Sequence, residues 1–256
     1  MAKQAHKPGI IVVLYSVYVW LVFGLVTLTI LIILLPFVIV RWSQMIQRAA
    51  IIWARILVGL TGIRLEAENT VALVTTGPVL FLANHQSYLD ILALYAILQL
   101  RIVWLAKASL FKIPLFGWAL RAAGSIPVER GNPVKARQSL YTAAQRIRRG
   151  LIVLIFPEGR RGPPDAIAAF KPGAFLLAAR AKVPVQPITL HGTWQVFPGL
   201  KRAGIPLVFR QYRIRIQVHP VQHRTDLSPA ELSQRMFRQI EAPLDRMRLF
   251  HEILDC

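Results

Sequence analysis

A run of 31 residues, 10–40, carries no charged side chain, and this run limits the possible folds more than any other feature. A helix of that length would extend roughly 46 Å, whereas about 20 residues suffice to cross the ~30 Å hydrocarbon layer of a bilayer. The run is too long for the apolar part of a signal peptide and lacks a small-residue cleavage site, so we expect it in the mature chain. The sequence therefore predicts a membrane segment near the amino terminus.

Two arrangements of this segment are compatible with the sequence. A single tilted span would place the amino terminus across the membrane, whereas a helical pair that bends near Gly24 or Pro36 would return to the same side. Basic residues flank the run on both ends, with Lys3 and Lys7 before it and Arg41 after it. Positive charge at both ends fits the helical pair under the positive-inside rule, but the single span stays open.

The charge of the chain indicates what it binds. The 256 residues suit one α/β domain with an appendage, and 31 Lys and Arg against 12 Asp and Glu give a net charge of +19. Anionic lipid is favoured over nucleic acid, because each basic residue near a bilayer contributes about 1 kcal/mol and no nucleic-acid-reading motif is present. Cys256 is the only cysteine, which excludes an internal disulfide and a cysteine-rich zinc site. We expect the catalytic part on the cytoplasmic face of the inner membrane.

The segment 41–60 has the pattern of a basic amphipathic helix at the membrane interface. Three arginines recur seven residues apart, and apolar residues recur at helical spacing between them: Arg41, Arg48 and Arg55, with Met45, Ala49, Ile52, Ile56 and Leu57. An ordinary helix that packs on the domain is the alternative interpretation. Gly62 is expected to end the helix.

From about residue 70, short apolar runs alternate with helix signals, which predicts an α/β domain. The expected strands span residues 78–83, 102–106, 125–128, 151–156, 185–190 and 214–218. Asn132 and Gly150 are expected to cap the two ends of a helix, and Ser228 with Glu231 predicts a capping box for a terminal helix that Pro243 should break or kink. The predicted fold is an αβα sandwich around a mixed, largely parallel sheet.

The first candidate site follows the strand VLFLA, in the segment Asn84-His85-Gln86-Ser87-Tyr88-Leu89-Asp90. On one continuous helix His85 and Asp90 would lie about 140° apart, so they can meet only if His85 lies in a turn and Asp90 in the first turn of the next helix. Asp90 would then fix the tautomer of His85 and leave the other ring nitrogen free to take a proton. Ser87 is expected to cap that helix. The pattern predicts a general base acting on a substrate hydroxyl, without a covalent enzyme intermediate.

A second strand also ends in a turn with reactive side chains. The sequence Phe156-Pro157-Glu158-Gly159-Arg160-Arg161-Gly162 combines a carboxylate with two guanidinium groups in a turn that proline and glycine make tight. Guanidinium groups bind phosphate oxygens in a bidentate manner. This turn is therefore a candidate anion-binding site.

Four segments in this order resemble the sequence blocks of the 1-acylglycerol-3-phosphate acyltransferases and their lysophospholipid acyltransferase relatives. The segments are NHQSYLD at 84–90, SIPVER at 125–130, FPEGRR at 156–161 and VPVQPI at 183–188. The resemblance covers about residues 70–195 and implies a glycerol-3-phosphate acyltransferase-like αβα fold. It also implies an O-acyltransferase that gives phosphatidic acid.

The resemblance implies a role for each matching residue. His85 is the expected base and Asp90 its orienting partner. The expected binding site for the acceptor's phosphate comprises Glu158, Gly159, Arg161, Arg130 and, as a weaker candidate, Lys107. Gly159 would let the backbone approach the substrate closely. Arg160 and Gly162 stand where the family usually has Thr and Ser, which makes the turn more basic and puts the acceptor headgroup in question.

We therefore predict an anchor over residues 1–65 and an acyltransferase domain over residues 66–256. The expected reaction moves a fatty acyl chain from acyl-CoA or acyl-carrier protein to the free hydroxyl of 1-acylglycerol-3-phosphate, with the bilayer as partner. The thioester is a co-substrate, and no metal or bound cofactor is expected. The alternatives are another lysolipid acceptor, such as a lyso-aminolipid or lysocardiolipin, and a non-catalytic membrane scaffold of the same fold.

Overall fold

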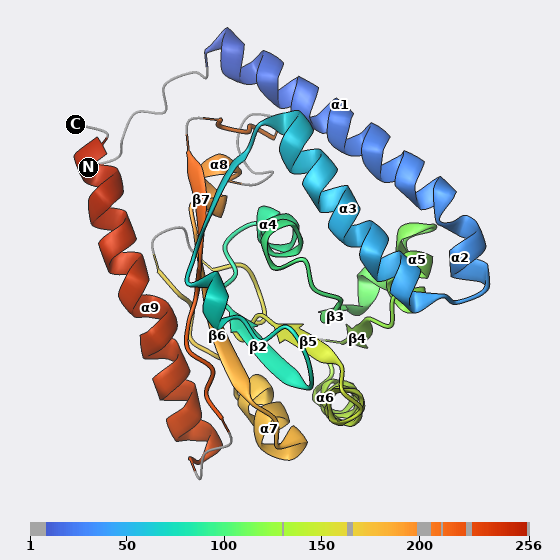
Figure 1. Cartoon of the computed structure of the whole chain (residues 1–256), viewed down its shortest axis with the longest axis vertical. Helices are drawn as coiled ribbons and strands as arrows, with labels where there is room; N and C mark the ends of the chain where they lie inside the picture. Colours follow the sequence, from blue (N-terminus) through green and yellow to red (C-terminus); the bar gives the residue numbers. More distant parts are fainter. Residues whose placement is uncertain are drawn as a thin grey trace.

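The computed structural model describes residues 9–129, 131–162, 166–198, 206–210, 212–223 and 227–254, with side chains to residue 244. Its centre is a seven-stranded sheet with the order β1-β7-β6-β2-β5-β3-β4. All neighbouring strands are parallel except β6 and β7. Helices cover both faces of this sheet (Figure 1). The predicted αβα sandwich with a mixed, largely parallel sheet is therefore confirmed.

Six of the strands lie where the sequence predicts them. The seven strands of the sheet are β1 (Arg64–Glu68), β2 (Val79–Ala83), β3 (Ile102–Lys107), β4 (Ile126–Val128), β5 (Ile152–Ile155), β6 (Val185–His191) and β7 (Arg213–Val218). The edge strand β1 was not predicted, because charged residues alternate with Leu65 and Ala67 and leave no apolar run. It begins at Arg64, just before the boundary predicted between residues 65 and 66.

The central strand β2 shows how the two layers of core are formed. All five of its residues are buried. Phe81 faces a core shared with α4 (Leu89–Leu98) and the amino-terminal helices. Leu80 and Leu82 face the opposite core, which contains residues of α6 (Pro133–Arg148), α7 (Pro172–Ala181) and α9 (Pro229–Leu254). Because neither face meets solvent, β2 reads as a continuous apolar run rather than an alternating one.

The amino-terminal segment forms a helical hairpin. It comprises α1 (Ile10–Ile33), α2 (Leu35–Ile39) and α3 (Ser43–Thr61), with α1 and α3 side by side (Figure 1). Pro36 lies in the first turn of α2, and the chain turns back between α2 and α3, where Arg41 adopts a left-handed conformation. Of the two bend positions that the sequence left open, Gly24 lies inside the unbroken α1. The returning arm of the hairpin is α3, which lies outside the apolar run 10–40, so both membrane arrangements stay predictions.

Hydrogen bonds on one side of α1 hold it to the rest of the protein. The Tyr15 hydroxyl donates to the carbonyl of Thr61 at 2.6 Å, and the Trp20 indole donates to the carbonyl of Pro206 at 2.7 Å. Ser16 is fully buried and accepts from the backbone of Val208. The other side of α1 exposes large apolar residues, and the helix is long and apolar enough to cross a membrane.

The helix α3 has a buried side and an exposed side. Ile46, Ala54 and Leu57 are buried, whereas Ile52 and Ile56 are exposed. Of the apolar residues singled out in the sequence, Leu57 faces the protein, Ile52 and Ile56 face outward, and Met45 and Ala49 are half-buried. Arg48 and Arg55 are exposed as expected, and Gly62 ends the helix in a left-handed conformation. The helix both packs on the domain and exposes a mixed basic and apolar face, so it combines the two interpretations.

The predicted helix caps are present, but the effect of one proline was overestimated. Asn132 caps α6 by accepting from the backbone N–H of Lys135 at 3.0 Å, and Ser228 and Glu231 form the capping box of α9. The helix α9 continues through Pro243 without a break. Ile240 and Leu244 beside the proline are fully buried, so tertiary packing outweighs the helix hydrogen bond that the proline removes.

Candidate active site

The two predicted turns leave the sheet at the same edge. The strands β2 and β5 are parallel neighbours, with Leu82 paired to Ile155 at their carboxyl ends. Residues 84–90 follow β2, and residues 156–162 follow β5. Open α/β sheets bind ligands at the carboxyl ends of their strands, so the fold brings together the two segments that the sequence singled out.

His85 and Asp90 are in direct contact. The Nδ1 atom of His85 lies 2.6 Å from Oδ2 of Asp90, and Asp90 is fully buried in the first turn of α4. The same oxygen accepts the backbone N–H groups of Gln86 and Ser87 at 2.7 and 2.9 Å. A carboxylate on Nδ1 places the ring proton there and leaves the lone pair of Nε2 available to accept a proton.

Further contacts fix the orientation of the His85 ring. It stacks on Phe156 with 4.0 Å between centroids and an interplanar angle of 11°, and its side chain is 13% exposed. The carbonyl of His85 accepts the N–H of Gly162 at 2.7 Å. The imidazole is thus held from both turns while part of it remains accessible.

Glu158 connects the two turns through backbone groups. Its Oε1 accepts from the N–H of His85 at 2.6 Å and its Oε2 from the N–H of Ala168 at 2.8 Å. Burial raises the pKa of Glu158 to about 7, and the two backbone hydrogen bonds oppose that rise. Since both oxygens already accept backbone groups, this geometry supports a positioning role. The predicted part of Glu158 in a phosphate site would then be indirect.

The backbone conformation at position 159 and the nearby side chain of Lys171 both favour glycine there. Its φ is +69°, and an added Cβ would lie 2.9 Å from Cδ and 3.1 Å from Nζ of Lys171. Lys171 also donates its backbone N–H to the carbonyl of Pro157 at 2.8 Å. The sequence does not predict this contact, which brings a further cation to the arginine turn.

The predicted cations gather at this edge. Arg160 and Arg161 are exposed in the turn after β5, and Lys107 is exposed at the end of β3, the other parallel neighbour of β5. The guanidinium carbon of Arg161 lies 3.6 Å from the ring centroid of Tyr88. Arg130 lies outside the described residues.

Ser87 contacts the start of α4, but it lies one residue before the capping position. The helix begins at Leu89 with Tyr88 in the capping position and no side-chain cap. The Ser87 hydroxyl accepts the backbone N–H of Leu89, the first residue of α4, at 3.3 Å and donates to the carbonyl of Phe197 at 3.0 Å. It therefore ties the start of α4 to the segment after α8 (Thr193–Val196).

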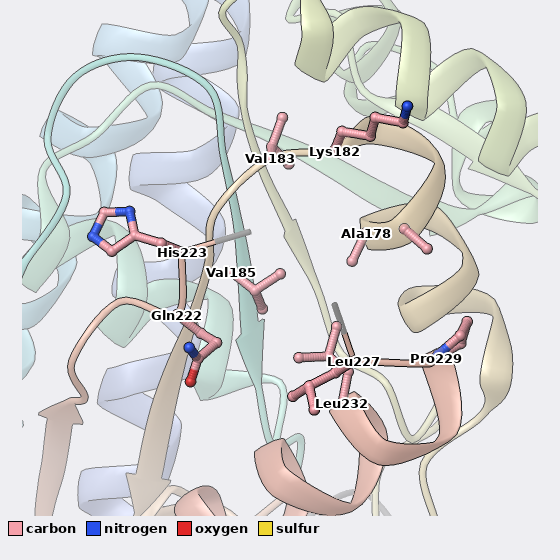
Figure 2. Close-up of a pocket in the computed structure, with 10 residues that line it drawn as sticks. Ala178, Lys182, Val183, Val185, Gln222, His223, Leu227, Pro229 and Leu232 are labelled. Atoms are coloured by element: carbon pink, nitrogen blue, oxygen red, sulfur yellow. The ribbon is translucent and has the colours of Figure 1, made fainter. Parts of the chain in front are cut away.

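A separate cavity lies at the opposite edge of the sheet. It has a volume of about 200 Å³ and is located between the end of α7 and the start of α9 (Figure 2). Lys182, Val185, His223 and Leu232 contribute to its lining. None of the predicted site residues lines this cavity, so it is distinct from the site at the strand ends.

The fold and the site define an α/β protein with a histidine–carboxylate pair suited to proton transfer beside a turn that exposes two arginines. The family model "Acyltransferase" matches residues 64–191. A 1-acyl-sn-glycerol-3-phosphate acyltransferase of Pseudomonas aeruginosa is 31% identical over 191 residues, which cover 72% of this chain and 71% of that protein. The chain therefore belongs to the Acyltransferase family, as the sequence blocks predict.

Other comparisons agree on the fold and the family. The crystal structure of the 1-acyl-sn-glycerophosphate (LPA) acyltransferase PlsC from Thermotoga maritima matches with a TM-score of 0.75 and 19% identity, over 93% of this chain and 97% of that chain. A chloroplastic 1-acyl-sn-glycerol-3-phosphate acyltransferase of Brassica napus is 34% identical over 142 residues, or 56% of this chain. The match spans only 40% of the plant protein's length.

Proposed function

We propose that this protein is an O-acyltransferase that moves a fatty acyl group from a thioester donor to the free hydroxyl of 1-acylglycerol-3-phosphate, giving phosphatidic acid. The observation that carries the proposal is the 2.6 Å contact between His85 Nδ1 and the buried Asp90, at the sheet edge that also presents Arg161. The relatives from Pseudomonas aeruginosa and Brassica napus are named for this acceptor, which supports the proposal.

The proposed reaction uses the free nitrogen of His85. Nε2 removes the proton of the acceptor hydroxyl as its oxygen attacks the thioester carbonyl carbon. The tetrahedral intermediate then collapses, the carbon–sulfur bond breaks, and the leaving thiolate takes the proton back from the imidazolium. General-base catalysis typically contributes roughly 10² to 10⁴ in rate, and positioning of two substrates can lower the barrier by roughly 7 to 11 kcal/mol.

The cations at the same edge would bind the acceptor's phosphate. Arg161 offers a planar group with several N–H donors, and Arg160 and Lys107 add positive charge nearby. Arg130 keeps its predicted place in this site. Acyl-CoA and acyl-carrier protein both remain candidate donors, and the proposed chemistry requires no metal or bound cofactor.

The proposal places the enzyme on a membrane, with its catalytic domain on the cytoplasmic face. Exposed apolar residues on α1 and exposed arginines on α3 support attachment to an anionic bilayer. Both the acceptor and the product are membrane lipids. Attachment would therefore bring the strand-end site to its substrate.

Replacement of the proposed base tests the reaction. His85→Ala should abolish transfer of a labelled acyl group to 1-acylglycerol-3-phosphate, while the variant should still sediment with membranes. His223→Ala is a matched control, because His223 is exposed at the opposite edge of the sheet and should leave turnover unchanged. Wild-type turnover by His85→Ala would exclude His85 as the base.

The second candidate function is the same acyl transfer to another lysolipid. The additional arginine in the turn 156–162 is the observation that favours it. Arg160 adds a positive charge at a position where the 1-acylglycerol-3-phosphate acyltransferases that the sequence resembles usually have threonine. A panel of lysolipids with different headgroups, each offered with acyl thioesters of several chain lengths, identifies the preferred acceptor. Absence of transfer to any member of the panel would instead support a non-catalytic scaffold.

A further inference from the structure

We propose that Tyr88 is a positioning residue whose ring holds the Arg161 guanidinium in the orientation that binds the acceptor's phosphate. This inference rests on the proposed function. The observation behind it is the distance of 3.6 Å between the guanidinium carbon and the ring centroid. Such a distance is well within the range of about 6 Å for a cation–π interaction.

The ring of Tyr88 is supported on one side by the protein. It packs against the ring of Phe197, with 6.2 Å between the centroids, and Phe197 is buried. The preceding Ser87 hydroxyl donates to the carbonyl of Phe197 at 3.0 Å. Tyr88 itself is 52% exposed. The turn and the buried phenylalanine therefore orient the ring, and one part of it remains available to Arg161.

The contact leaves the donors of Arg161 available. Among the described residues, Arg161 forms no ion pair with a carboxylate. A guanidinium carbon 3.6 Å above the ring centroid is at the separation of two stacked planes, so the ring covers one flat face and the N–H groups point outward in the guanidinium plane. Bidentate phosphate binding uses those in-plane donors. Tyr88 can thus orient the cation without competing with the ligand.

The position of Tyr88 also links the two functional turns. Tyr88 lies between His85 and Asp90 in the sequence, whereas Arg161 follows β5. A ring contact between them sets the position of the phosphate relative to the imidazole. Loss of the ring should therefore weaken acceptor binding more than it slows the chemical step.

The expected effect follows from the strength of an exposed cation–π contact. Such contacts contribute about 0.5–1 kcal/mol, and a factor of ten corresponds to about 1.4 kcal/mol. Tyr88→Leu should accordingly raise the acceptor KM about two- to fivefold. The donor KM and kcat should change by less than about twofold. Tyr88→Phe keeps the ring and should behave like the wild type.

A double-mutant cycle with Arg161→Ala tests whether Tyr88 acts through Arg161. If it does, Tyr88→Leu should have no further effect on the acceptor KM in the Arg161→Ala background. Tyr141→Leu is a matched control, because Tyr141 is similarly exposed on α6, 48% against 52% for Tyr88. Thermal unfolding of each variant checks that the fold is retained.

Three results would overturn the inference. An equal effect of Tyr88→Leu with and without Arg161 would show that the two residues act independently. An equal rise of the acceptor KM in Tyr88→Phe would assign the effect to the hydroxyl, and a fall in kcat alone would indicate a disturbed catalytic turn.

A binding measurement separates this inference from the proposed function. The same double-mutant cycle is measured by binding of 1-acylglycerol-3-phosphate to the detergent-solubilised protein without a donor. A wild type that binds this lipid but transfers no acyl group would contradict the proposed function and leave the binding cycle decisive for Tyr88.

Discussion

At the residue scale, two buried carboxylates shape the site in different ways. One oxygen of Asp90 accepts hydrogen bonds from the His85 ring and from two backbone N–H groups. Glu158 instead uses one oxygen for the backbone of His85 and the other for that of Ala168. Asp90 therefore orients the imidazole directly, whereas Glu158 positions the backbone that carries it.

The raised pKa of Glu158 makes stability depend on pH. Its pKa is about 7 in the folded protein and ordinarily 4.5, so the folded state binds the proton more tightly than the unfolded state does. Its contribution to the free energy of unfolding therefore falls as pH rises from about 4.5 through 7, by roughly 2 to 3 kcal/mol between pH 5 and 8.

The variant Glu158→Gln tests this dependence. The amide cannot ionise, so thermal unfolding of the variant should change less between pH 5 and pH 8 than that of the wild type. The variant should be less stable than the wild type at pH 5, because one backbone N–H loses its acceptor. Parallel melting temperatures of the two proteins across this pH range would contradict the assigned pKa.

Part of the site was predictable at this scale. The spacing of His85 and Asp90 indicated that they meet only across a turn, and the structure places them so. The contacts of Glu158 with the His85 backbone and of Arg161 with Tyr88 join residues about 73 positions apart. No local periodicity encodes such contacts, because they depend on which strands become neighbours in the sheet.

At the element scale, burial decides which elements the sequence reveals. The strands β2 and β5 have both faces covered and appear as apolar runs. The edge strand β1 pairs only with β7, and its charges face solvent, with Glu66 pairing to Arg213 and Arg215. The continuation of α9 through Pro243 was likewise hidden, because the packing that stabilises it comes from distant segments.

The cap of α6 gives a test at this scale. Asn132 accepts the N–H of Lys135 at 3.0 Å, and no acidic residue lies in the first turn of the helix. Asn132→Ala should lower the free energy of unfolding by about 1 kcal/mol, measured by thermal or denaturant unfolding. Asn132→Asp retains an acceptor and should preserve stability, so an equal loss in both variants would argue against the cap.

At the scale of the whole molecule, the hairpin gives the protein one strongly apolar side. Leu21, Leu25 and Leu28 on α1 are 69, 70 and 52% exposed. The polar residues Tyr15 and Ser16 of the same helix make hydrogen bonds to the protein. The exposed leucines are therefore among the residues of α1 available to lipid.

Replacement of the three leucines by serine should weaken binding to anionic vesicles by at least about tenfold, because each buried leucine contributes roughly 1.5 kcal/mol or more. Vesicle sedimentation measures the partition. The matched control replaces Val134, Leu151 and Leu176, which are exposed away from the hairpin at 75, 40 and 53%, and should leave the partition unchanged. Equal losses in the two triple variants would show that α1 has no special role.

The short connection between α3 and β1 has a consequence for kinetics. Only Gly62 and Ile63 separate the end of α3 from the start of β1, and β1 is hydrogen-bonded to β7 along its length. With the hairpin in lipid as proposed, no flexible linker would let the domain move away from the membrane surface. Its acceptor would then arrive by lateral diffusion, and turnover would follow the mole fraction of that lipid within the leaflet rather than its amount per volume of solution.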